Sequence, residues 1–145
     1  MAVAGFTQPA PDVEPIGTAS GAFFALSVAD LKASAQWYAG KFGLKTVMQM
    51  PKSNGAAVAV LEGGGLIVEL VERDDAKPGP SDAMRIHGIA KAGIIVADFD
   101  KTVALLKARR VEIAFGPFPA TSAQRANVIV KDNAGNLIQF FGKSR

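Results

Sequence analysis

The sequence predicts an α+β protein built from two consecutive βαβββ modules, and two observations support this prediction. The segments FFALSVADLKASAQW and KAGIIVADFDKTVALL share one order: a strand, then Val-Ala-Asp, then an amphipathic helix. Matching positions also keep nearly the same offset, since Val28 and Val96 are 68 residues apart (96 − 28) and Glu69 and Gln139 are 70 apart (139 − 69). A fixed internal period indicates a repeated structural unit.

The first module begins with alternating apolar residues over 22–28, which predict a half-buried strand. Asp30 is suited to cap a helix over 31–42, and Gly43 is suited to end it, because glycine tolerates a positive φ. Glycine-rich turns then separate further β-rich runs. We expect three strands, near 44–50, 56–62 and 65–72.

The second module repeats this order after a connecting segment. Residues 89–96 predict a strand and 99–109 a helix, and the DNAG of residues 132–135 predicts the last hairpin turn. The remaining strands are expected near 111–115, 125–131 and 136–142.

The chain therefore divides into an arm and one domain. Residues 1–20 are rich in Ala, Pro, Gly and Thr and are expected to form a flexible arm, not a signal peptide. Residues 21–145 are expected to form the domain. Its parts are module one (21–73), a proline-containing linker (74–88) and module two (89–143).

Composition excludes several classes of function. The net charge of +3 is spread over 145 residues without a Lys/Arg run, which argues against nucleic-acid binding. The apolar stretches are too short to cross a bilayer, so we expect no membrane span. A cytoplasmic location is expected separately. The absence of cysteine excludes disulfides and thiolate metal sites.

Two motifs, VADLKASAQWYAGKFGL and VKDNAGNLIQFF, resemble those of the vicinal oxygen chelate superfamily, which contains glyoxalase I, extradiol dioxygenases, fosfomycin-resistance enzymes and bleomycin-resistance proteins. The resemblance covers about residues 21–143, with Asn133 where the family usually has proline. It implies that the two modules pair their sheets into a cupped, barrel-like mixed sheet that holds the site. It also implies a homodimer, as in many relatives.

Side chains alternate across a strand, so sequence parity assigns each residue to a face. One set of alternate residues, which includes Val68 and Phe140, is expected under the helices. The other set is expected to line the cup: Phe23, Ala25, Ser27, Ile67, Glu69, Val71, Lys91, Gly93, Ile95, Leu137, Gln139 and Phe141.

The resemblance places the four ligand positions of metal-dependent relatives at Phe23, Glu69, Lys91 and Gln139. Phe23 has no donor atom. Lys91 would first have to lose a proton, which costs about 4.6 kcal/mol at pH 7 from a reference pKa of about 10.4. Glu69 and Gln139 alone fall short of the three protein ligands that a catalytic zinc ion generally has. We therefore predict neither a metal ion nor another cofactor.

The substituted positions allow three interpretations of Lys91. It could form a structural ion pair with Glu69, with Gln139 beside them, because a buried ammonium group needs a partner. It could bind an anionic or carbonyl-bearing ligand. It could act as a catalytic amine, which would require a lowered pKa that a neighbouring Glu69 opposes.

Aromatic residues complete the predicted ligand-binding set. Phe141 follows Gln139 on the same face of the strand, and Phe115 or Phe118, in the loop-like segment 115–125, could cover a bound molecule. His87, the only histidine, lies in the linker, where only a register shift would bring it close to the site.

We expect a metal-independent protein that binds a small organic molecule, similar in kind to the bleomycin-resistance proteins. The alternative is a divergent lyase, isomerase or dioxygenase-like enzyme with a non-standard site, whose catalytic residues the sequence does not identify. A third possibility is a domain that serves assembly only. The sequence leaves open whether the cup forms within one chain or between two.

Overall fold

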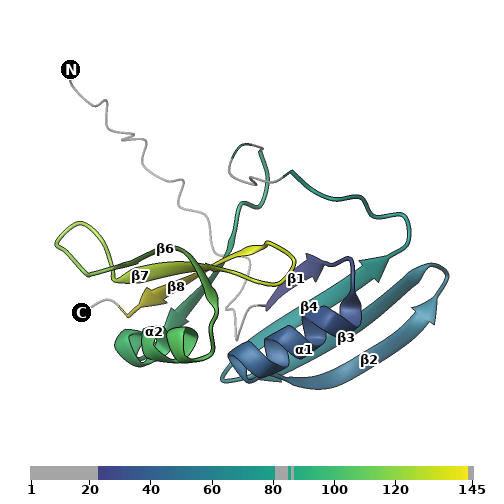
Figure 1. The fold of residues 1–145 in the computed structure, drawn as a ribbon, viewed down its shortest axis with the longest axis horizontal. Coiled ribbons are helices and arrows are strands. Elements are labelled where there is room, and N and C mark those ends of the chain that lie inside the picture. Colours follow the sequence, from purple (N-terminus) through teal and green to yellow (C-terminus); the bar gives the residue numbers. More distant parts are fainter. Residues whose placement is uncertain (1–22, 81–84, 86, 144–145) are drawn as a thin grey trace, which may run out of the picture.

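The computed structural model describes residues 23–80, 85 and 87–143, and the predicted arm at 1–20 lies outside these ranges. Figure 1 shows two modules side by side, each with one helix and four strands. The elements in chain order are β1 (Phe23–Ser27), α1 (Leu31–Phe42), β2 (Lys45–Ser53), β3 (Ala56–Gly63), β4 (Leu66–Arg73), β5 (Ala92–Val96), α2 (Phe99–Ala108), β6 (Glu112–Phe118), β7 (Asn127–Lys131) and β8 (Leu137–Gly142).

Both modules have the same sheet topology, which confirms the predicted repeat and the α+β class. The first sheet has the order β1-β4-β3-β2 and the second the order β5-β8-β7-β6. In each sheet the first strand pairs in parallel with the last, and the remaining pairs are antiparallel. Each helix leads from the first strand of its sheet to the strand at the opposite edge, from β1 to β2 and from β5 to β6. The linker returns the chain from the end of β4 to the start of β5 (Figure 1).

Both helices begin with the same capping interaction. Asp30 and Asp98, which are 68 residues apart (98 − 30), have extended backbones, and their carboxylates accept hydrogen bonds from Ala33 N (2.8 Å) and Lys101 N (2.9 Å). A side-chain acceptor at this position satisfies one of the free amides of the first helical turn. The aspartate of each Val-Ala-Asp motif therefore fixes where its helix starts.

The core lies on the side of each sheet that faces its helix. Val68 and Leu70 of β4 are fully buried, as are Val130 of β7 and Ile138 of β8. Tyr38 of α1 is also fully buried. The alternating residues predicted to lie under the helices therefore do so, and each sheet has a second face that neither α1 nor α2, the helices of the described residues, covers.

The two modules contact each other through α1, which meets the turn after β7, strand β8 and the C-terminal end of α2. The Tyr38 hydroxyl donates to Asp132 Oδ2 over 2.8 Å, and the Phe42 and Phe140 rings meet edge to face with centroids 5.5 Å apart. Asp132 also accepts from the backbone of Ala134 and from Asn136. This contact involves the helix side of the second sheet, so it does not itself cover the opposite faces of the two sheets.

Several strand ends differ from the sequence prediction, and β2, for example, continues to Ser53 beyond the predicted residue 50. β5 begins at Ala92 instead of residue 89, and β6 continues to Phe118, in the segment expected to be a loop. β6 has two register irregularities, and its extension contains the second of them together with the cis peptide Gly116–Pro117. Bulges and proline are typical of an edge strand, which pairs on one side only. None of the helices in the described part of the chain is long and apolar enough to span a membrane.

Candidate small-molecule site on the open sheet faces

The face of each sheet that its helix does not cover is called here the open face. On the second sheet, strand register aligns its residues in rows across four strands, because directly paired residues point to the same side. The middle row is Phe115, Ile129, Gln139 and Gly93, and the next row is Phe118, Asn127, Phe141 and Ile95.

The first sheet has an equivalent open face. Its middle row is Met48, Val60, Glu69 and Ala25, and its neighbouring row is Met50, Val58, Val71 and Ser27. Each middle row thus carries one polar side chain, Glu69 or Gln139, beside a very small residue. These small residues, Ala25 and Gly93, are 68 apart (93 − 25) and are equivalent in the repeat.

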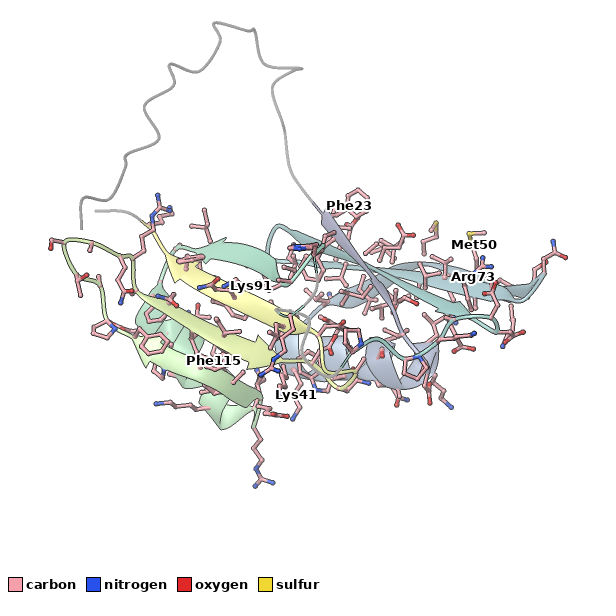
Figure 2. All side chains as sticks on the ribbon, turned by 90° about the horizontal axis from the view of Figure 1, so that it is seen from above. Phe23, Lys41, Met50, Arg73, Lys91 and Phe115 are labelled. Carbon is pink, nitrogen blue, oxygen red and sulfur yellow. The ribbon has the colours of Figure 1, made fainter. Side chains whose placement is uncertain are left out.

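The open faces are largely apolar and exposed. Phe23 and Ile95 are each 62% exposed, and Phe115 is 55% exposed. Met50 of the first sheet and Phe115 of the second lie in opposite halves of the molecule along its long axis (Figure 2). An apolar surface of this extent usually marks a binding site or an interface.

Gln139, which interrupts the apolar run of β8, lies on the open face as predicted but is only 8% exposed. Its Nε2 donates to Asn127 Oδ1 over 3.1 Å, and Asn127 Nδ2 donates to the carbonyl oxygen of Arg125 over 3.1 Å. The glutamine is thus held by a side chain from the neighbouring strand. Sequence reasoning missed Asn127, although a polar residue at the start of the apolar run NVIV was a visible signal.

Glu69 and Lys91 do not form the ion pair that was one interpretation of the sequence. Glu69 is half-buried and Lys91 is exposed, and neither side chain has a hydrogen bond or ion pair with any described residue. Lys91 precedes β5, while Glu69 is in the middle of β4 on the other sheet. The structure therefore leaves Glu69 on the open face of the first sheet and Lys91 exposed just before β5, and their side chains are not paired with each other.

The predicted aromatic residues lie on both sheets. Phe118 and Phe141 are in one row of the second sheet because each pairs with Asn127. Phe23 pairs with Ile67 at the edge of the first sheet. His87 is exposed in the linker. Among the described residues, no three His, Asp or Glu side chains are placed to hold a metal ion together.

A groove of about 410 Å³ lies elsewhere, between α1 and the helix side of β2 and β3. Its walls include Ala35, Thr46, Gln49 and Glu72. Glu72 accepts hydrogen bonds from Leu31 N (2.8 Å) and Lys52 Nζ (3.2 Å), which hold the pKa of its carboxyl below the usual range. Its role is to fix the start of α1 onto the end of β4.

The fold and the open faces define a two-module α+β protein with polar groups at the centre of an apolar sheet surface. Residues 22–140 match the family model described as Glyoxalase/Bleomycin resistance protein/Dioxygenase superfamily. The match covers most of the chain, and the protein belongs to this superfamily. A comparison with curated proteins gave no significant match.

Solved structures show the same fold. A glyoxylase/bleomycin resistance protein/dioxygenase domain from Frankia sp. EAN1pec has a TM-score of 0.72 and 17% identity, over 88% of this chain and 100% of that chain. The antibiotic binding protein TnmS3 from Streptomyces sp. CB03234 has a TM-score of 0.64 and 17% identity, over 90% and 100% of the two chains.

A third structure is a mutant of the fosfomycin resistance protein FosX from Listeria monocytogenes, complexed with Mn(II) and 1S,2S-dihydroxypropylphosphonic acid. It has a TM-score of 0.59 and 15% identity, over 87% of this chain and 93% of that chain. At such identities the likeness concerns the fold, so the function has to be argued from the residues of this chain.

Proposed function

We propose that this protein binds a small organic molecule on its open faces without a metal ion. The observation that carries the proposal is the composition of the four positions that correspond to the metal ligands of relatives. Phe23 offers no donor and Lys91 offers a cation, which leaves only Glu69 and Gln139. Those two lie on different sheets, and two oxygen ligands fall short of a catalytic metal site.

The character of the open faces supports a binding role. Small-molecule sites are mostly apolar, with a few polar groups that orient the ligand. The middle rows have this composition, with Glu69 and Gln139 among Met, Val, Ile and Phe side chains. Structures of this fold include an antibiotic binding protein, TnmS3, which is the kind of activity proposed here.

The proposal includes a homodimer in which a second copy covers the open faces. Within one chain, Phe23, Ile95 and Phe115 remain more than half exposed, because the contact between the modules uses the helix side. A second copy related by a twofold axis would bury the same faces on both chains, as closed symmetric oligomers do. The first sheet of one copy would then face the second sheet of the other, and the cup would be shared between them.

The test of metal independence uses the full chain, purified and treated with EDTA. Bleomycin and a panel of aromatic acids, amides and amines serve as probes in a thermal-shift assay, and metal content is measured by mass spectrometry. The proposal expects a rise in melting temperature with at least one probe and no dependence on added Mn²⁺ or Zn²⁺. Binding that appears only after metal is restored would contradict it.

The role of Lys91 is tested by comparing Lys91→Ala with Lys101→Ala, an exposed lysine on α2, away from the open faces. If Lys91 receives the anionic or carbonyl group of a ligand, its replacement should weaken binding of the acidic probes, and the Lys101 variant should bind like the parent protein. Equal binding by all three proteins would remove Lys91 from the site.

A further inference from the structure

We infer that Asn127 orients the Gln139 side chain so that its carbonyl oxygen is presented beside Gly93, and that this oxygen selects ligands carrying an N–H or O–H donor. The inference rests on the proposed binding function and specifies which molecules the open face of the second sheet accepts. Asn127 is a positioning residue in this scheme, Gln139 makes the contact, and Gly93 provides the space for it.

The orientation follows from a chain of hydrogen bonds that begins at the backbone. The carbonyl oxygen of Arg125 can only accept, so the Asn127 group that contacts it must be the amide nitrogen. Asn127 Oδ1 therefore faces Gln139, and the atom of Gln139 that meets it must be the donor Nε2. This leaves Gln139 Oε1 on the side away from Asn127.

The same oxygen has no partner within the described residues, and none of the described side chains has a buried polar atom without a hydrogen bond. Oε1 must therefore reach the surface, although Gln139 as a whole is only 8% exposed. Gly93 is directly paired with Gln139, and a Cβ added there would meet nothing within 4 Å. The absence of a side chain at Gly93 thus leaves an opening beside the glutamine.

The surroundings make this acceptor selective. Ile129 and Phe115 lie in the same row as Gln139, and Leu137 and Phe141 lie on either side of it along β8. A flat apolar ligand placed on these side chains would exclude water from Oε1. A ligand with a donor at that point replaces the lost hydrogen bond to water, whereas one without a donor leaves a covered acceptor unpaired, which is costly.

Two probes of similar shape separate these cases: benzamide, which carries an amide N–H, and methyl benzoate, which has only acceptors. Binding to the ¹⁵N-labelled full chain is followed by NMR, using backbone amides and the side-chain amide of Gln139. We expect benzamide to bind about fivefold more tightly than methyl benzoate, within the range that one hydrogen bond supplies. In the free protein, nuclear Overhauser effects should place the Gln139 Nε2 protons next to Asn127.

Two variants affect the acceptor in different ways. Asn127→Leu keeps the opening but removes the group that orients Gln139, so both probes should bind with similar affinity. Gly93→Val keeps the orientation but fills the opening, so the preference for benzamide should again be lost while the Gln139–Asn127 signals persist. The φ of Gly93 is outside the positive range of the strained glycines, and β-branched residues suit strands, so this variant should fold.

The outcomes distinguish this inference from the proposed function. Equal binding of the two probes to the parent protein, or a preference that survives in Asn127→Leu, would overturn the inference and leave small-molecule binding intact. If neither probe shifts signals from either open face at millimolar concentration, the inference and the binding proposal both fail for this class of ligand. A Gln139 amide oriented with its oxygen toward Asn127 would overturn the inference without any ligand.

Discussion

Lys41 and Arg109 each donate a hydrogen bond to the backbone carbonyl of the other, across the boundary between the two modules. Lys41 Nζ contacts the Arg109 carbonyl, and an Arg109 guanidinium nitrogen lies 2.9 Å from the Lys41 carbonyl. The two residues are 68 positions apart (109 − 41), the offset that also separates the helix caps Asp30 and Asp98. The contact is therefore symmetric within one chain, and it connects the C-terminal ends of both helices.

Replacing Arg109 should destabilise the association of the modules. A helix end has unsatisfied carbonyls and favours a positive charge, and Arg109 supplies both a donor and a charge to α1. We expect Arg109→Ala to lower the free energy of unfolding by about 1.5–3 kcal/mol, the range for a hydrogen bond with a charged group. Urea denaturation measures this change. Lys107→Ala, at an exposed position of α2, is the matched control and should lower the free energy of unfolding much less.

Tyr38→Phe should also be destabilising, because it removes the buried hydroxyl that donates to Asp132. We expect a loss of about 1–3 kcal/mol at neutral pH, since one oxygen of a buried carboxylate loses a partner while the ring packing is kept. Comparing urea denaturation of the variant and the parent protein gives the value. An unchanged free energy of unfolding would show that the Tyr38–Asp132 contact does not hold the modules together.

Tyr38 should also make the stability of the folded protein depend on pH in the alkaline range. Burial and the neighbouring Asp132 raise the pKa of Tyr38 far above its ordinary value of 10.0. The folded state therefore retains this proton where the unfolded state loses it, so the stability it contributes is present below about pH 10 and falls as the pH rises further. In the Tyr38→Phe variant, stability should not show this part of the decline as the pH rises above about 10.

Phenolate absorbance provides a direct measurement, because Tyr38 is the only tyrosine in the sequence. Folded protein should develop no phenolate signal as the pH is raised through 10, and the signal should appear together with unfolding. Ionisation near pH 10 in protein that still has its folded circular dichroism spectrum would contradict the buried, hydrogen-bonded arrangement of Tyr38.

A charge on the open face should prevent the proposed homodimer. Ile95 is 62% exposed in one chain and would be buried by a second copy, where an unpaired carboxylate is costly. We expect Ile95→Glu to shift the mass measured by sedimentation from dimer to monomer. Leu105→Glu is the control, because Leu105 is also an exposed apolar residue, at 40%, but lies on α2. A parent protein that is monomeric at all concentrations would refute the dimer.

Glu72 should link the stability of the first module to acidic pH. Hydrogen bonds from Leu31 N and then from Lys52 lower the pKa of the Glu72 carboxyl. The stability that it contributes is therefore present above its ordinary pKa, near 4.5, and is lost as the pH falls through the lowered value. The Glu72→Gln variant should have a lower melting temperature than the parent protein at neutral pH and nearly the same melting temperature at the lowest pH. Thermal unfolding across this pH range measures the difference. A constant difference across the range would contradict this linkage.

The sequence by itself determined the features of the fold that depend on local chemistry. Asp30 and Asp98 specified where both helices begin, alternation in β4 and β8 separated the helix side from the open face, and the offset of about 68 residues established the repeat. The caps and the strand faces depend on neighbours a few residues away in the chain, so spacing and parity reveal them, and the repeat is visible because the same local pattern occurs twice. They also placed Gln139 on the correct side of its strand.

Contacts between distant segments were decided only by the tertiary structure. The pairing of Gln139 with Asn127 depends on the register of β7 against β8, and the lack of an ion pair between Glu69 and Lys91 depends on how the two modules are placed. The Tyr38–Asp132 and Lys41–Arg109 contacts, which hold the modules together, join residues 94 and 68 positions apart. No local pattern encodes such distances, because they result from the packing of whole elements.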